Sequence, residues 1–212
     1  MKIALFGATG RVGRAILTLL LEQDIKVTAL VRNPEKVEPH VGLTVLQGDA
    51  RNTADIVETL AGVDAVISAL GTDKTTVLTE SITHIISIMQ KEHLKRIITI
   101  GTAGILDSRT EVGGLRYQSS ESKRKSTTAA REHHRVFELL QDAPLDWTIV
   151  CPTYLPTGNA TEEYIVLRDQ LPEEAVQTTT GDTALFAVNE LLKNEHIGYR
   201  VGIMSPILGE AK

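Results

Sequence analysis

Short apolar runs alternate along the chain with stretches in which apolar residues recur every three or four positions. The runs are typical of strands buried on both faces of a parallel sheet, and the periodic stretches are typical of amphipathic helices. The pattern predicts six strands, at residues 3–6, 25–31, 43–46, 63–68, 95–100 and 146–151. Helical patterns between most of them predict an α/β fold, a doubly wound parallel sheet with helices on both faces.

Two later regions interrupt this alternation. Residues 106–128 are polar, with a Gly-Gly pair and the basic run Lys123-Arg124-Lys125, and we expect a long loop there. The basic run is either a solvated surface or a site that recruits an anionic substrate. Residues 157–180 are irregular, with one short strand expected at 164–167. A helix then follows at 182–194, which Thr180 or Asp182 is expected to cap.

Composition bounds the class of protein. The chain has 212 residues, which predicts a single domain over 1–212, and its hydrophobic (42%) and charged (23%) fractions are ordinary for a globular protein. A net charge of −5 gives no support to nucleic-acid or membrane binding. Because Cys151 is alone, no internal disulfide is possible. Without a signal-peptide pattern or a membrane-length apolar run, we expect a cytoplasmic protein.

A glycine-rich turn directly after the first strand carries the strongest chemical signal. Gly7, Gly10 and Gly13 follow the apolar run 3–6 with the spacing G-x-x-G-x-x-G, and a helical pattern begins at once. Glycines at these places let the chain turn tightly, let a pyrophosphate approach the backbone, and let the helix pack on the sheet. The N–H groups that begin a helix favour phosphate. Although an ordinary strand–helix turn also contains glycine, this context favours a dinucleotide-binding loop.

The end of the second strand bears on the choice of cofactor. NAD sites commonly have a carboxylate there for the ribose hydroxyls, whereas an arginine suits the 2′-phosphate of NADP. Here the strand ends in Val31-Arg32-Asn33, without a carboxylate. Arg11 and Lys36 add positive charge nearby. We therefore predict NADP(H) in preference to NAD(H), the alternative for Arg32 being a solvated charge at a strand end.

Several motifs together resemble one family. They occur in order at suitable distances, as Gly7-Ala8-Thr9-Gly10-Arg11-Val12-Gly13, Leu30-Val31-Arg32, Gly48-Asp49, Ala69-Leu70-Gly71 and Asp146-Trp147-Thr148-Ile149-Val150-Cys151-Pro152. The chain resembles the atypical short-chain dehydrogenase/reductases, and within them the NAD(P)H-binding, NmrA-like group that includes flavin reductase/biliverdin-IXβ reductase. The resemblance implies a Rossmann-type fold with a small, irregular substrate region at about 103–128 and 152–180.

The resemblance also implies the cofactor contacts. Those around the pyrophosphate would be Gly7, Thr9, Gly10, Arg11 and Val12, with Gly13 behind them. Arg32 would meet the 2′-phosphate, and Asp49 and Ala50 would border the adenine. Below the adenine-side ribose and phosphates would lie Ala69, Leu70 and Gly71. The nicotinamide would lie near Thr102, Pro152, Thr153 and Tyr154.

The sequence signal for catalytic residues is weaker than the signal for cofactor binding. Many relatives use a Tyr-x-x-x-Lys pair as proton donor, but none of the four tyrosines here has a lysine four residues later. Thr102 and Tyr154 are the remaining candidates at the nicotinamide. His133 and His134 either line the substrate cleft or lie on the surface. No pattern predicts a metal site, and Cys151 is expected to be an inert buried thiol rather than a nucleophile.

The missing pair weighs against ordinary alcohol or ketone chemistry, which needs a tuned proton donor. Hydride transfer to a flavin requires mainly stacking and positioning, with a proton from water. We therefore predict an NADPH-dependent reductase acting on a flavin or quinone-like conjugated small molecule. The alternative is a non-catalytic, NADP(H)-binding redox-sensing regulator of the NmrA-like type, and a sugar-nucleotide epimerase is a weaker third. The sequence does not specify an oligomeric state.

Overall fold

One eight-stranded sheet runs through the molecule. The computed structural model describes residues 1–73, 75–122 and 126–205, so the basic run 123–125 lies outside the described residues. The strand order is β3-β2-β1-β4-β5-β6-β8-β7. The strands are β1 (Lys2–Phe6), β2 (Lys26–Val31), β3 (Leu43–Gln47), β4 (Ala65–Ser68), β5 (Arg96–Ile100), β6 (Asp146–Pro152), β7 (Ile165–Arg168) and β8 (Tyr199–Met204). All six strands predicted in the first part of the chain are present.

The order of the strands creates a switch point beside β1. Strand β1 pairs in parallel with β2 on one side and with β4 on the other. The chain therefore builds outward to β3, then crosses over to β4 and builds in the opposite direction. Among the strands of the described residues, only β7 runs antiparallel, against β8. Open parallel sheets bind ligands at the carboxyl ends of their strands, where the order reverses.

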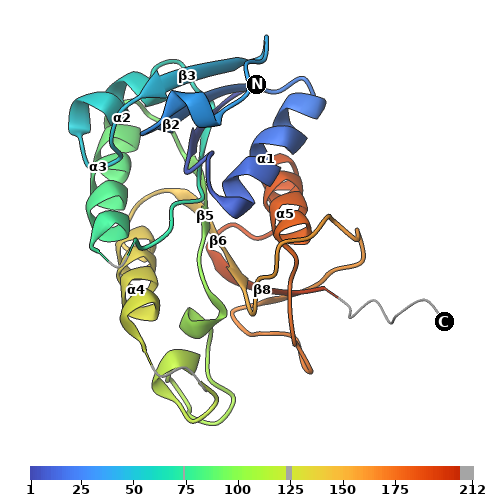
Figure 1. Cartoon of the computed structure of the whole chain (residues 1–212). Helices are drawn as coiled ribbons and strands as arrows, with labels where there is room; N and C mark the ends of the chain where they lie inside the picture. Colours follow the sequence, from blue (N-terminus) through green and yellow to red (C-terminus); the bar gives the residue numbers. More distant parts are fainter. Residues whose placement is uncertain (74, 123–125, 206–212) are drawn as a thin grey trace, which may run out of the picture.

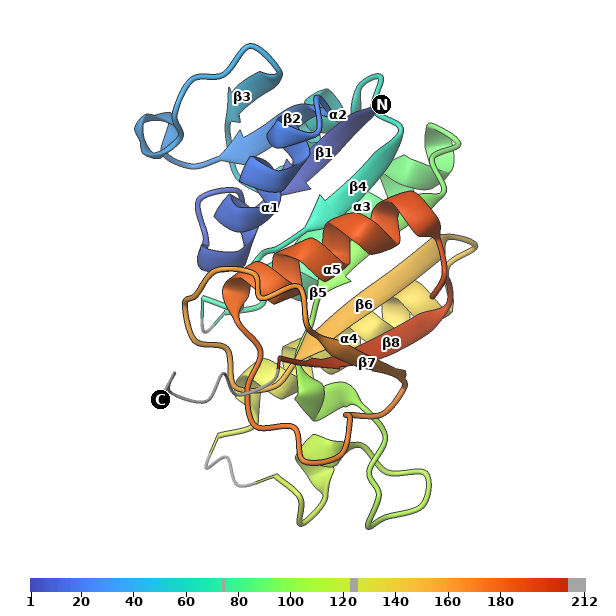
Figure 2. The same cartoon turned by 90° about the vertical axis from the view of Figure 1, so that its right-hand side faces the viewer.

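Helices cover both faces of the sheet (Figure 1). Helices α1 (Arg11–Glu22) and α5 (Thr180–Lys193) pack together on one face. On the other face lie α2 (Thr53–Leu60), α3 (Val77–Lys91) and α4 (Thr128–Gln141). Figure 2 shows α1 and α5 in front of the sheet, on the face turned toward the viewer. The predicted doubly wound α/β fold is confirmed.

Each helical layer encloses an apolar core against the sheet. Ile16 and Leu20 of α1 are fully buried against β1, and α3 buries Ile85 and Met89 on the opposite face. Burying a side chain of this size contributes about 1.5–3 kcal/mol to the free energy of unfolding. The apolar periodicity seen in the sequence is therefore the energetic reason for the layers. In the described ranges, no helix is both long enough and apolar enough to cross a membrane.

The start of α5 corrects one sequence prediction. The N-cap residue is Thr179, whose hydroxyl oxygen accepts a hydrogen bond from the Asp182 N–H at 2.9 Å, rather than Thr180 or Asp182. The buried Asp182 carboxylate instead accepts hydrogen bonds from the Thr161 N–H (2.7 Å) and the Ser205 hydroxyl (2.5 Å). The Asp182 carboxylate thus connects α5 to the segments that contain Thr161 and Ser205, and the local sequence spacing does not reveal these contacts.

Candidate functional site

The glycine loop fits only glycine at two positions. Gly7 has φ +82°, and a Cβ there would lie 2.5 Å from the carbonyl oxygen of Ala69. A Cβ on Gly13 would overlap the carbonyl group of Gly7. The Gly10 N–H donates to that same Gly7 carbonyl at 2.9 Å, which closes the turn. The loop therefore holds the start of α1 close against the ends of β1 and β4.

This arrangement leaves the start of α1 open for an anion. Gly10 occupies the N-cap position and has no side chain to accept hydrogen bonds from the first turn. The first turn also contains no acidic residue that would compensate the positive end of the helix dipole. The backbone thus provides hydrogen-bond donors and a favourable potential for a phosphate.

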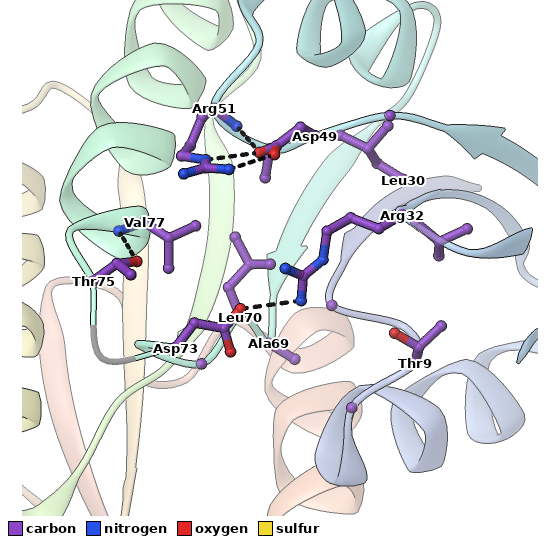
Figure 3. Close-up of a pocket in the computed structure, with 16 residues that line it drawn as sticks. Thr9, Leu30, Arg32, Asp49, Arg51, Ala69, Leu70, Asp73, Thr75 and Val77 are labelled. Atoms are coloured by element: carbon purple, nitrogen blue, oxygen red, sulfur yellow. Dashed lines mark hydrogen bonds and ion pairs between the residues drawn. The ribbon is translucent and has the colours of Figure 1, made fainter.

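A cavity of about 600 Å³ adjoins this helix start (Figure 3). It lies at the carboxyl ends of β1, β2, β3 and β4, across the switch point of the sheet. Its walls contain most of the predicted cofactor residues, namely Gly7, Thr9, Gly10, Arg32, Asp49, Ala50, Ala69, Leu70 and Gly71. Apolar Leu30, Leu70 and Val77 lie on its walls beside charged groups, a mixture that suits a purine nucleoside.

Two arginines line the cavity, each paired with a carboxylate. Arg32 Nη2 lies 3.0 Å from Asp73 Oδ2, and these side chains are 71% and 55% exposed. Arg51 Nη2 lies 2.7 Å from Asp49 Oδ2, and hydrogen bonds from Arg51 lower the pKa of Asp49 to about 2. Sequence reasoning missed Arg51 and Asp73, although both follow a predicted strand end by a few residues.

A second cavity, of about 620 Å³, lies farther along the carboxyl edge of the sheet. Thr102 enters it from the end of β5, and Thr153 and Tyr154 enter it from the end of β6. The opposite wall comes from residues within 116–122 and 126–130, including Tyr117 of the short 3-10 helix η3 (Arg116–Gln118). The segments after β4 and β5 border the two cavities, and these strands are neighbours in the sheet.

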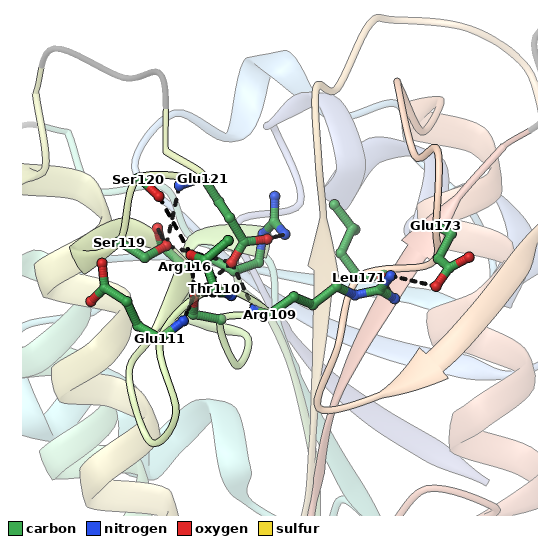
Figure 4. Close-up of polar contacts among 10 residues, drawn as sticks. Arg109, Thr110, Glu111, Arg116, Ser119, Ser120, Glu121, Leu171 and Glu173 are labelled. Atoms are coloured by element: carbon green, nitrogen blue, oxygen red, sulfur yellow. Dashed lines mark hydrogen bonds and ion pairs between the residues drawn. The ribbon is translucent and has the colours of Figure 1, made fainter.

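Half-buried charged residues order the outer wall of the second cavity (Figure 4). Glu121 accepts hydrogen bonds from the Ser108 hydroxyl (2.6 Å) and the Arg109 N–H (2.8 Å), and it pairs with Arg116. Burial would raise the pKa of Glu121, but these hydrogen bonds and the Arg116 charge outweigh it and lower the pKa. Arg109 also donates to the carbonyl oxygen of Leu171 at 2.8 Å. The predicted long loop is thus cross-linked over its described residues.

The other predicted residues lie behind the cavities. Val12 and Gly13 are buried in the first turn of α1, and Pro152 is buried at the end of β6. The Arg11 guanidinium donates to the carbonyl oxygen of Leu155 at 2.7 Å, which joins the glycine loop to the segment after β6. These four residues therefore do not line either cavity but lie next to residues that do.

Cysteine and histidine chemistry follows from burial. Burial raises the pKa of the Cys151 thiol to about 12, as expected for an inert thiol. Burial lowers the pKa of His133 to about 4. His134 is 26% exposed, and its Nδ1 lies 3.0 Å from the hydroxyl of Tyr117, so it contacts a residue of the second cavity. Within the described ranges, no three His, Cys, Asp or Glu residues are grouped as metal ligands.

Comparison with known proteins agrees with this geometry. A family model described as NAD(P)H-binding matches residues 7–194. The uncharacterized protein YwnB of Bacillus subtilis is 27% identical over 213 residues, which span 97% of this chain and 99% of that protein. The structure of a putative NADH-flavin reductase from Streptococcus pneumoniae is 25% identical with a TM-score of 0.82, covering 97% of this chain and 100% of that chain. The fold also matches ChuY, an anaerobillin reductase from Escherichia coli, with 24% identity, full coverage of both chains and a TM-score of 0.81.

Proposed function

This chain belongs to the NAD(P)H-binding family, in agreement with the predicted resemblance, and from that premise we propose that it is an NADPH-dependent reductase of a flat, conjugated acceptor. One observation carries the proposal. Two cavities of similar size lie along the carboxyl edge of one sheet, one bordered by the segment after β4 and the other by the segment after the neighbouring strand β5. A dinucleotide laid along this edge places its adenosine in the first cavity and its nicotinamide beside the second.

The residues of the first cavity fit the adenosine half. The start of α1 provides donors for the pyrophosphate, and the predicted loop contacts are Gly7, Thr9, Gly10, Arg11, Val12 and Gly13. Asp49 and Ala50 would border the adenine, and Ala69, Leu70 and Gly71 would lie below the ribose. Thr102 and the segment from Pro152 to Tyr154 would flank the nicotinamide. When bound, this cofactor supplies the hydride.

The preference for NADPH rests on the cations of the first cavity. Arg32 is mostly exposed at the cavity wall, and its guanidinium matches the geometry of a phosphate. Arg51 adds a second guanidinium. The carboxylates of Asp49 and Asp73 already have arginine partners, and neither directly follows β2, the usual place for the carboxylate that binds ribose in NAD sites. The wall therefore favours a 2′-phosphate over a free 2′-hydroxyl.

The second cavity suits the acceptor. Its described lining combines threonine and serine hydroxyls with Ala103, Ala130, Ala175 and the aromatic rings of Tyr117 and Tyr154. Such a mixture can stack a planar ring and hydrogen-bond its edge. A flavin or a quinone has this chemistry.

The test is the rate at which the purified protein oxidises NADPH under anaerobic conditions, with FMN as acceptor and with NADH in parallel. We expect multiple turnovers, faster with NADPH than with NADH at low cofactor concentration. Tight binding of NADPH without turnover would reject the reductase and support a redox-sensing regulator. The absence of binding would reject both.

A further inference from the structure

A tyrosine and a histidine from different elements meet at the second cavity. The Tyr117 hydroxyl in η3 lies 3.0 Å from Nδ1 of His134 in α4, and the two rings meet edge to face with centroids 5.7 Å apart. Tyr117 lines the cavity together with Thr102 and Thr153. A phenol hydrogen-bonded to an imidazole is a competent pair for proton transfer, because either partner can donate.

His134 makes further contacts on the side away from the cavity. The imidazole of His134 stacks beside Phe137, with centroids 6.5 Å apart, and its Nε2 lies 3.8 Å from Oε1 of Glu138. The side chain of Glu138 is 47% exposed. The Gln118 side-chain amide donates to the Tyr117 oxygen at 3.1 Å, which helps to fix the phenol. The contacts therefore extend from the cavity, through the imidazole, to a carboxylate that water reaches.

Tyr154, the tyrosine expected at the nicotinamide from sequence, lacks such a connection. It lines the same cavity, but it is 63% exposed. Within the described part of the chain, its hydroxyl makes no hydrogen bond to another residue, whereas Tyr117 has two partners. Only Tyr117 combines a place in the cavity wall with a basic side chain behind it.

We propose that Tyr117 is the proton donor to the acceptor, that His134 re-protonates it, and that the acceptor class is a conjugated carbonyl compound such as a quinone. The inference rests on the proposed function and deepens it. As hydride adds to the conjugated carbonyl, a carbonyl oxygen gains the electron pair of the C=O bond. That oxygen takes the proton of the Tyr117 hydroxyl. The phenolate takes the Nδ1 proton of His134 as water delivers a proton to Nε2 of the same imidazole, on the side of Glu138, so His134 stays neutral. One hydride and one proton are therefore added in total.

The experiment compares Tyr117→Phe, His134→Asn and Tyr154→Phe with the wild-type protein and with Tyr199→Phe, a matched loss of a phenol hydroxyl on β8. Each protein is assayed anaerobically with NADPH and either 9,10-phenanthrenequinone or FMN. Reduction of the quinone requires a proton on oxygen, whereas hydride transfer to FMN can take its proton from water. A second measurement needs no cofactor: the ¹⁵N resonances of the His134 side chain report whether its Nδ1 bonds to the Tyr117 hydroxyl.

We expect Tyr117→Phe to lower kcat with the quinone by about 100-fold, within the range for loss of a general acid. His134→Asn should lower the same kcat by at least about 10-fold, while FMN reduction and the NADPH Kd stay within about twofold. The ¹⁵N resonance of Nδ1 should move in Tyr117→Phe and not in Tyr199→Phe. An equal loss with quinone and FMN, a larger loss in Tyr154→Phe, or an unchanged Nδ1 resonance would overturn the inference.

The same assay separates this inference from the function beneath it. If the wild-type protein reduces FMN but not the quinone, the inference fails and the proposed reductase stands. If it reduces neither acceptor, the proposed function fails as well.

Discussion

The Arg32–Asp73 ion pair makes an unusual prediction about cofactor affinity. If the Arg32 guanidinium binds the 2′-phosphate of NADPH, Asp73 competes with that phosphate for the same cation and repels it. Replacing Asp73 by Asn removes the competitor and the repulsion, so NADPH should bind more tightly. Replacing Arg32 by Ala removes the cation, so NADPH should bind more weakly. NADH, which has no 2′-phosphate, should respond little to either change.

The structure sets the size of these effects. The nitrogen and oxygen are 3.0 Å apart, but both side chains are more than half exposed, so the pair itself is worth about 0–1 kcal/mol. Asp73→Asn should therefore lower the NADPH Kd by about two- to fivefold. A hydrogen bond to a charged group contributes about 1.5–3 kcal/mol, and exposure places this one at the lower end. Arg32→Ala should thus raise the NADPH Kd by about 10- to 30-fold.

Fluorescence titration of both variants with NADPH and NADH, at constant ionic strength near 0.1 M, measures these changes. Repetition at about 1 M salt should shrink both, because the charges are exposed to solvent. Weaker NADPH binding in Asp73→Asn would refute the reasoning. So would an Arg32→Ala variant that loses NADPH and NADH affinity equally.

Three further predictions follow from burial and close packing. Gly13→Ala should lower the free energy of unfolding by about 1–3 kcal/mol in urea, because its Cβ overlaps the Gly7 carbonyl group, whereas Gly71→Ala, with no neighbouring atom within 4 Å of the added Cβ, should not. Cys151 should resist iodoacetamide at pH 8 until the protein unfolds, since burial raises its pKa to about 12. His133 has its folded-state pKa lowered to about 4, so the unfolded chain binds a proton first as the pH falls below about 6.5. Between pH 7 and pH 5 the wild-type protein should lose about 1–2 kcal/mol more stability than His133→Asn, and equal losses would contradict this.

The glycine loop and the sheet could be predicted because their signals are local. The run 3–6 and the three glycines occupy a single stretch, and only glycine fits at Gly7 and Gly13. Arg32 was also predictable, since it directly follows β2. Each of these inferences needs only neighbours in sequence and the geometry of a strand–helix unit.

The paired charges and the Tyr117–His134 contact could not be predicted in the same way. Arg32 meets Asp73 across the switch point, 41 residues later, and Tyr117 meets His134 from a separate element, 17 residues away. A search for a base four residues after a tyrosine detects only pairs on one helix. Here the phenol and the imidazole come from η3 and α4, so only the packing of the residue 107–121 segment brings them together.

Calorimetric titration of the wild-type protein with NADPH and with NADH tests the central claim most directly. It measures the affinity for each cofactor, and the difference between the two affinities gives the contribution of the 2′-phosphate. The account predicts one binding site, with NADPH bound at least about 10-fold more tightly, which corresponds to about 1.4 kcal/mol. Equal or tighter binding of NADH would contradict the role assigned to Arg32. The absence of heat with either cofactor, together with unchanged thermal stability, would contradict the assignment of the cavity itself.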